Sequence, residues 1–269
     1  MTLRLVTWNI NSIRVRLDHL ARVVQEINPH VLCLQETKVT DGLFPRAEVE
    51  ALGFSHQHIY GIKGYNGVAI LSRLPLTEPA RHDWCGRQDG RHVSAYLEGG
   101  GGKRLEIHSL YIPAGGDVPD PEANPKFAHK LEFLKQTTAW FRKHGRNSGP
   151  MILGGDLNVA PLKTDVWSHK QLLGVVTHTP VEVAHLARLQ DSASWTDAVR
   201  SFIPPEERLY SWWSYRARDW RKNNRGRRLD HIWVNEPLRG SLAGAQVMTS
   251  ARDWKRPSDH VPVVVDLKL

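Results

Sequence analysis

Polar side chains follow several short apolar segments of the chain, at the points where those segments end. Residues 3–8 are followed by Asn9, residues 31–35 by Glu36, residues 105–110 by Tyr111, and residues 151–153 by the segment GGDLN, which contains Asp156 and Asn158. One such residue is most often a cap or a turn former. Several of them at the ends of neighbouring strands indicate a functional site, because sites are commonly built on the loops at sheet edges.

Glu36 and Asp156 follow different strands, so their carboxylates can converge on one hard cation. Mg²⁺ is the natural candidate, because it takes oxygen ligands and keeps water molecules that a phosphate can replace. Asp156 and Asn158 are two residues apart and can face the same cleft. The alternative for GGDLN is a tight turn whose glycines permit positive φ and whose Asp caps the next segment. The spacing leaves both interpretations open.

Two Asp-His pairs lie near the C-terminus. Asp230 and His231 begin one predicted strand, and Asp259 and His260 precede the last one. An imidazole whose tautomer is fixed by a carboxylate is the usual arrangement for general acid-base chemistry or for orienting a phosphate. The spacing does not settle which Asp is the partner of His260.

The charge of the chain indicates a polyanionic partner. Its 269 residues contain 36 Lys and Arg against 28 Asp and Glu, a net charge of +8. The segment 216–228 alone carries +6, from seven basic residues and Asp219, and aromatic residues such as Trp212 and Trp220 lie within or just before it. Cations next to aromatic rings are what a nucleic acid backbone and an exposed sugar or base require. The alternative is a solvated loop with Trp212 or Trp213 in the core.

The pattern of apolar residues also predicts the strands and helices that position these polar residues. Residues 3–8, 31–35, 67–72 and 151–153 are apolar runs typical of strands buried on both faces. Apolar residues at helical spacing predict helices over 13–27 and 127–141, each leading into a buried strand, and β-α-β units of this kind imply parallel pairing. Residues 105–109 and 261–267 alternate as half-buried strands do, residues 209–215 are strand-like, and no linker or repeat interrupts residues 1–269. The pattern predicts one α/β domain with mixed sheets.

The composition of the chain indicates the cellular compartment in which the protein acts. Cys33 and Cys85 are too few and too far apart for a disulfide framework or a Cys-based zinc site, which favours a reducing compartment. No stretch approaches the roughly 18 apolar residues that a membrane helix needs. The sequence therefore predicts a cytoplasmic protein that does not act at a membrane.

Seven segments taken together resemble the exonuclease III family of AP endonucleases, within the endonuclease/exonuclease/phosphatase superfamily. They are TWNINSIR (7–14), LQETK (34–38), GVAILSR (67–73), SLYIP (109–113), GGDLNVAP (154–161), NRGRRLDHI (224–232) and SDH (258–260). The resemblance implies a four-layer α/β sandwich, with two central mixed β-sheets flanked by helices and a site at one end. Residues 162–195 resemble the bacterial exodeoxyribonuclease III branch.

The resemblance also implies roles. Glu36 is the expected principal ligand of Mg²⁺, for which Mn²⁺ can substitute, with Asn9 and Asp259 near it. Asp156 is expected to activate the attacking water, and Asn158 to orient that water or to stabilise the transition state. Tyr111 is expected to lie against the phosphate or the leaving group, and His260, held by Asp230, to contact the scissile phosphate. The expected DNA contacts are Asn11, Arg14, Lys38, Tyr65, Asn66, Arg225, Arg227 and Arg228, together with Trp212 and Leu229, which wall a pocket for a flipped-out abasic sugar. Arg227 stands where strongly AP-specific relatives carry a bulky aromatic residue.

The expected function is that of a Mg²⁺-dependent DNA repair phosphodiesterase, a monomer acting on double-stranded DNA with abasic or 3'-blocked sites. It would incise 5' to abasic sites and process 3'-termini as a 3'-5' exonuclease and 3'-phosphatase. One alternative is a phosphodiesterase of the same fold that cleaves RNA or phospholipid. Another is a DNA-binding scaffold without catalysis, which would require the loss of Glu36, Asp156 or His260, and all three are present.

Overall fold

Two β-sheets pack face to face in the computed structural model, which describes residues 2–98, 104–145, 149–216 and 219–269. Each sheet has six strands within these ranges. In order across the first sheet, the strands are β13 (Leu242–Val247), β14 (Val263–Lys268), β1 (Thr2–Asn9), β2 (Val31–Gln35), β4 (Val68–Ser72) and β3 (His56–Tyr60). In the second sheet they are β5 (Leu76–Arg81), β6 (His92–Glu98), β7 (Arg104–Tyr111), β8 (Met151–Asp156), β12 (Asp230–Val234) and β9 (Thr196–Asp197).

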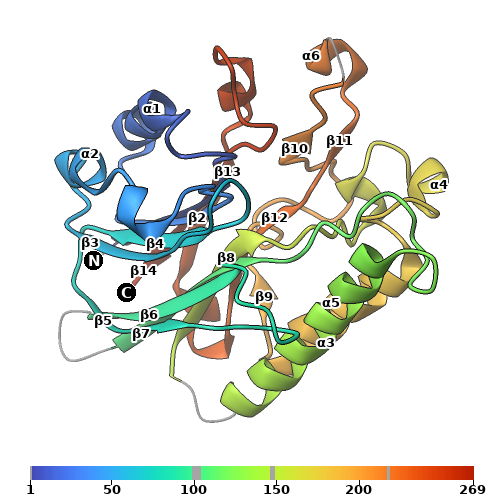
Figure 1. The fold of residues 1–269 in the computed structure, drawn as a ribbon, viewed down its shortest axis with the longest axis horizontal. Helices are drawn as coiled ribbons and strands as arrows, with labels where there is room; N and C mark the ends of the chain where they lie inside the picture. Colours follow the sequence, from blue (N-terminus) through green and yellow to red (C-terminus); the bar gives the residue numbers. More distant parts are fainter. Residues whose placement is uncertain (1, 99–103, 146–148, 217–218) are drawn as a thin grey trace.

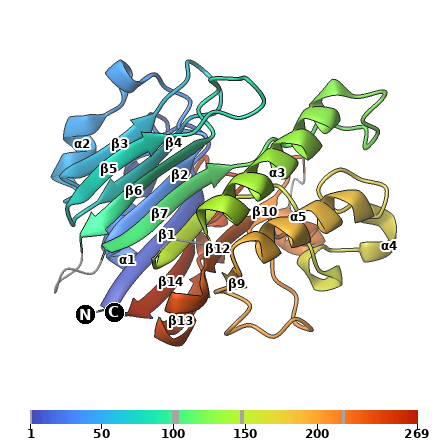
Figure 2. The ribbon, with the colours of Figure 1, turned by 90° about the horizontal axis from the view of Figure 1, so that it is seen from below.

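Helices cover the outer face of each sheet (Figure 2). The first sheet packs against α1 (Leu17–Ile27) and α2 (Arg46–Ala51), and the second against α3 (Pro125–His144) and α5 (Pro180–Ser192). The predicted four-layer sandwich with two mixed sheets is therefore confirmed. The remaining elements are α4 (His169–Leu172), α6 (Trp220–Asn223), the short pair β10 (Trp212–Trp213) and β11 (Gly226–Arg227), and the 3₁₀ turns η1 (Asp41–Leu43), η2 (Lys163–Asp165), η3 (Glu236–Ser241) and η4 (Thr249–Asp253).

The apolar runs of the central strands are explained by these layers. In β1, Leu3 and Leu5 lie in the core between the two sheets, whereas Val6 and Trp8 lie in the core under the helices. Successive strand residues point to opposite faces, so a strand covered on both sides must be apolar at every position. The same rule corrects the prediction for residues 105–109, which are buried on both faces and not half-buried, because α3 covers the outer face of β7.

The two β-α-β units have the predicted pairing. β1 and β2 are parallel, as are β7 and β8, and the other neighbouring pairs are antiparallel. The first helix begins at Leu17, later than the predicted residue 13, and ends where Asn28 adopts a left-handed conformation just before Pro29. The predicted strand 209–215 is reduced to Trp212–Trp213.

This topology gathers the polar strand ends at one edge. The carboxyl ends of β1, β2, β7 and β8 lie there, and so do the amino ends of β12 and β14, because β12 runs antiparallel to β8 and β14 antiparallel to β1. The chain termini lie away from this edge (Figure 1). No helix within the described ranges combines the length and apolarity needed to cross a membrane.

Candidate active site

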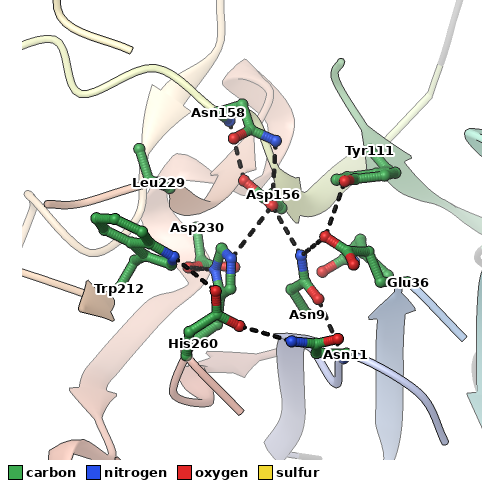
Figure 3. Close-up of polar contacts among 12 residues, drawn as sticks. Asn9, Asn11, Glu36, Tyr111, Asp156, Asn158, Trp212, Leu229, Asp230 and His260 are labelled. Atoms are coloured by element: carbon green, nitrogen blue, oxygen red, sulfur yellow. Dashed lines mark hydrogen bonds and ion pairs between the residues drawn. The ribbon is translucent and has the colours of Figure 1, made fainter. Parts of the chain in front are cut away.

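Asn9 connects the two sheets at this edge (Figure 3). Its Nδ2 donates to Glu36 Oε1 and to Asp156 Oδ2, both at 2.9 Å, and its Oδ1 accepts from the backbone N–H of Asn11 at 3.1 Å. Asn9 is next to Glu36, as predicted. It turns its amide nitrogen toward the two carboxylates and holds them in place.

Glu36 is held from two further sides. Tyr111 Oη donates to Glu36 Oε1 at 2.8 Å, and Lys38 Nζ lies 2.7 Å from Glu36 Oε2. Burial would raise the pKa of Glu36, but the Lys38 ammonium and the bond from Asn9 outweigh it and lower that pKa. The carboxylate is therefore ionised at neutral pH and available to a cation.

Asp156, His260 and Asp230 form a buried chain of charges. Asp230 Oδ2 lies 2.8 Å from His260 Nδ1, and Asp156 Oδ2 lies 3.6 Å from His260 Nε2. Burial opposes the imidazolium, but the carboxylates of Asp230 and Asp156 raise the pKa of His260 to about 10. Burial raises the pKa of Asp156 to about 7, against the pull of His260. The structure thus identifies Asp230 as the partner of His260, as the resemblance implied.

Asn158 and Asp259 complete the cluster. Asn158 donates from its backbone N–H to Asp156 Oδ1 at 3.0 Å and from Nδ2 to Asp156 Oδ2 at 3.2 Å. The two carboxylate oxygens of Asp259 accept from Trp212 Nε1 and Asn11 Nδ2, each at 2.9 Å. Glu36 and Asn158 have φ of 52° and 51°, in the left-handed region that is uncommon for non-glycine residues and least costly for Asn and Asp.

The donor set fits a divalent cation of the Mg²⁺ class. Four carboxylates, those of Glu36, Asp156, Asp230 and Asp259, meet in this cluster, and the cations that form ion pairs with them among the described residues are Lys38 and His260. A hard divalent ion would balance the remaining negative charge and takes carboxylate oxygens as ligands. Ligand atoms of Asp156, Asp230 and His260 also lie within 4.8 Å of one another. The His260 imidazolium cannot ligate, however, so Glu36 is the better ligand.

A cleft of about 580 Å³ opens beside the cluster. Glu36, Tyr111, Asp156, Asn158 and His260 lie in its floor and walls. The remaining wall is apolar on one side and basic at the rim, and its members include Trp167, Leu172, Val176, Trp212, Leu229, Arg216, Arg225 and Arg227. Trp212 and Leu229 therefore lie where the resemblance implied, on the wall of a pocket next to the carboxylates.

Besides Leu229, which is 3% exposed where it lines the cleft, two of the predicted DNA contacts have buried side chains. Arg228 is 1% exposed and forms ion pairs with Asp197 at 2.5 Å and Asp165 at 3.7 Å. Asn66 is 7% exposed, and its amide bonds to Asp89 O and to Arg91. Both predictions are corrected, because neither side chain is free to touch a ligand.

The other predicted contacts are more accessible. Arg14, Tyr65 and Arg225 are exposed, and Lys38 and Asn11 are partly exposed and bond to each other through Lys38 Nζ and Asn11 Oδ1 at 2.6 Å. Arg227 is half-buried, and its guanidinium donates to Val176 O and to Thr177 Oγ1. Of the basic segment 216–228, residues 217–218 lie outside the described ranges.

Sequence reasoning missed a buried ion pair behind the cluster. Lys130 and Glu182 are both 0% exposed, with Nζ 2.5 Å from the carboxylate. Lys130 Nζ also donates to the backbone oxygen of Asn158 at 2.7 Å, and Glu182 accepts from the backbone N–H of Thr177 at 2.9 Å. The pair thus fixes both Asn158 and the cleft wall that Arg227 contacts. One signal was available, since Lys130 lies on the apolar face of its helix, three residues after Phe127.

Comparisons with known proteins agree with this geometry. Residues 6–260 match the model of the Endonuclease/Exonuclease/phosphatase family. Exodeoxyribonuclease III of Haemophilus influenzae is 30% identical over 274 residues, which cover 99% of this chain and 100% of that protein. Among solved structures, an AP endonuclease from Archaeoglobus fulgidus has a TM-score of 0.89 and 28% identity, covering 99% of this chain and 100% of that one. The 3' phosphatase NExo from Neisseria, bound to product DNA hairpin, has the same TM-score and coverage with 29% identity.

The raised pKa of His260 predicts how stability changes with pH. A group whose pKa rises on folding, here from 6.5 to about 10, stabilises the fold fully below 6.5, and this contribution is lost as pH rises through about 10. We therefore expect the free energy of unfolding in urea to fall between pH 7 and 10. Asp230→Asn should flatten that fall, because it removes the main charge that raises the pKa. An imidazole of His260 that titrates near 6.5 by NMR would contradict the assignment.

The burial of Arg228 predicts a large cost for its removal. Arg228→Met removes the close ion-pair partner of Asp197, whereas Asp165 keeps its ion pair with Arg200. Breaking a buried ion pair costs about 3–5 kcal/mol. Arg225→Met, on the exposed side of the same segment, should change the free energy of unfolding by less than about 0.5 kcal/mol. Urea denaturation of both variants measures this, and equal values would show that Arg228 is not a structural residue.

Proposed function

The chain belongs to the endonuclease/exonuclease/phosphatase family, and from this membership and the geometry of the site we propose that it is a Mg²⁺-dependent phosphodiesterase of DNA repair. The observation that carries the proposal is the buried group of Asp156, His260 and Asp230 beside the Glu36 carboxylate. This group can remove a proton from water and contact a phosphate within the same few ångströms. A scaffold without catalysis would not need it.

Each residue of the cluster has a proposed task. Asp156, ionised above its raised pKa, accepts a proton from the attacking water, and Asn158 holds its carboxylate in position. The His260 imidazolium, oriented by Asp230, donates to a phosphoryl oxygen, and Tyr111 lies against the phosphate. Mg²⁺ held by Glu36, with Asp259 nearby, would supply the positive charge that stabilises the developing negative charge on the phosphate.

The cleft favours a sugar without a base. Its apolar wall of Trp212, Leu229 and Val176 fits deoxyribose, and its rim cations Arg216 and Arg225 fit the flanking phosphates. The substrate we propose is therefore double-stranded DNA with an abasic site, incised 5' to that site, or DNA with a blocked 3'-terminus. The names of the relatives, which include an AP endonuclease and a 3' phosphatase, support both activities.

The domain organisation, oligomeric state and cellular location are inferred from the same observations. We propose that residues 1–269 form a single domain, since the family match runs unbroken from residue 6 to residue 260 and both sheets contribute to one site. We further propose that the protein acts as a monomer in the cytoplasm, where Cys33 and Cys85 stay reduced; both are free thiols in the structure.

Metal dependence is tested on a duplex with one abasic site. EDTA should abolish incision, and Glu36→Gln should reduce the rate about 100-fold or more at limiting Mg²⁺, because it removes the charge that holds the cation. Excess Mg²⁺ should partly restore the Glu36→Gln rate, and DNA affinity should change little. Glu50→Gln, an exposed residue of α2, is the matched control. Normal turnover of Glu36→Gln at limiting Mg²⁺ would remove Glu36 from the metal site.

The position of Arg227 leads to a prediction about the ratio of abasic-site incision to 3'-exonuclease activity. Its guanidinium lies 5.4 Å from the centre of the Trp212 ring and is bonded to the 176–177 wall, so it borders the sugar pocket without filling it as a planar ring would. Arg227→Trp should raise abasic-site incision relative to 3'-exonuclease activity by up to about tenfold, which is roughly 1.4 kcal/mol in a transition-state difference.

Rates on matched duplexes measure this ratio. Arg225→Trp, on the rim, controls for the loss of one positive charge and should leave the ratio unchanged. A ratio for Arg227→Trp that stays the same, or that moves toward the exonuclease, would exclude Arg227 from the control of specificity.

A further inference from the structure

A second group of metal-ligand side chains lies on the outer face of the second sheet, under α3. His92 in β6 and His108 in β7 point to this face, because the odd-numbered residues of both strands fill the core between the sheets. His82 follows β5, and its backbone N–H donates to His92 O at 3.1 Å. Two histidines from adjacent strands and a third from the segment after β5 therefore meet at one place.

Their spacing is that of ligands around one ion. One ring nitrogen from each of His82, His92 and His108 lies within 4.8 Å of the others, and His92 Nε2 is 3.1 Å from His108 Nδ1. Two imidazoles bound to tetrahedral Zn²⁺ at about 2.0–2.1 Å have nitrogens about 3.3 Å apart. The strands thus hold two of the nitrogens at close to that separation.

The histidines are also in the protonation state that binds metal. His92 and His108 are both 0% exposed. Burial lowers the pKa of His82 to about 4, that of His108 to about 3, and that of His92 well below its ordinary value. All three are neutral at pH 7, and neutral imidazole is the ligand form.

A network of hydrogen bonds alone does not satisfy this group. His92 Nδ1 and His108 Nε2 have no hydrogen-bond partner among the described residues. A buried polar atom without a partner costs about 1–3 kcal/mol, so two such atoms in adjacent side chains need a reason. These two atoms are the ring nitrogens that point away from the facing pair, His92 Nε2 and His108 Nδ1, so the facing pair is the one available to hold an ion.

The surroundings are those of a ligated histidine. His108 Nε2 lies 3.5 Å from Glu106 Oε1, and Glu106 Oε2 lies 2.8 Å from His144 Nε2. A carboxylate behind the non-ligating nitrogen is the usual support of a metal-bound histidine. The rings of Trp84, Trp140 and Phe141 pack around the histidines.

We propose that His82, His92 and His108 form a structural Zn²⁺ site that joins β6, β7 and the segment after β5. The fourth position of the tetrahedron is open to a water molecule or to Ser94, whose hydroxyl lies 2.9 Å from His82 Nε2. The site differs from the carboxylate cluster in its donors, since imidazole nitrogen suits Zn²⁺ and carboxylate oxygen suits Mg²⁺. It does not depend on the proposed function.

Cobalt spectroscopy tests the site. Metal-free protein is titrated with Co²⁺ in excess Mg²⁺, which occupies the carboxylate cluster. The expected result is one equivalent of Co²⁺ with the intense visible bands of tetrahedral coordination, displaced by one equivalent of Zn²⁺. Zn²⁺ should also raise Tm by about 5 °C or more, because it binds only the folded state. Weak octahedral bands, or no binding, would overturn the proposal.

Substitutions of single histidines test which side chains bind the ion. His82→Phe removes a ligand from the half-exposed edge of the group while keeping a ring against Trp84 and Trp140, so the fold should survive and Co²⁺ affinity should fall at least about tenfold. His169→Phe is the matched control, because His169 and His178 also form a close pair, at 2.8 Å, but with no third ligand among the described residues. A Co²⁺ spectrum that survives His82→Phe, or that His169→Phe abolishes, would refute the assignment.

Discussion

Four carboxylates at one end of the sandwich must coexist where little water reaches them, and the rest of the site is organised by that constraint. Glu36, Asp156, Asp230 and Asp259 repel one another, and burial alone would protonate them. Lys38 and His260 offset part of the charge, while the Asn9 amide holds Glu36 and Asp156 together without adding any. The balance is incomplete, because the pKa of Asp156 still lies near 7. The charged side chains are therefore already in position to bind a divalent cation and then a phosphate group.

Such an arrangement needs both sheets. Asn9 and Glu36 come from the first sheet, whereas Tyr111, Asp156 and Asp230 come from the second, so the spacing of the carboxylates is set by the apolar core between the sheets. The loops that leave this edge adopt conformations that the strands would not, and Glu36 and Asn158 have positive φ there. The packed strands beneath hold these loop residues in place.

Sequence patterns indicated which strand ends carry the candidate site, but not which side chains contact one another there. Glu36 and Asp156 could be predicted because each ends an apolar run, and an apolar run is a local property. The pairing of His260 with Asp230 could not be settled by spacing, since the two residues belong to segments 30 positions apart that meet only through tertiary packing. The Lys130–Glu182 pair joins two helices that meet only through tertiary packing, and the cleft wall near Val176 is a loop with no regular pattern. The fold class was predictable for the same reason as the strands, because burial on two faces leaves a continuous apolar signature.

The basic segment shows that charge in a sequence is not the same as charge on a surface. Arg228 forms buried ion pairs with Asp197 and Asp165. Arg221 forms an ion pair with Asp253, and Arg227 donates hydrogen bonds to the cleft wall at Val176 and Thr177. Of the described residues in this segment, Arg216, Lys222 and Arg225 remain exposed without a salt bridge. The segment therefore shapes the cleft as much as it attracts a polyanion. Since one short stretch both anchors the wall and forms the rim, a change that weakens attraction to DNA there would also alter the space offered to the sugar.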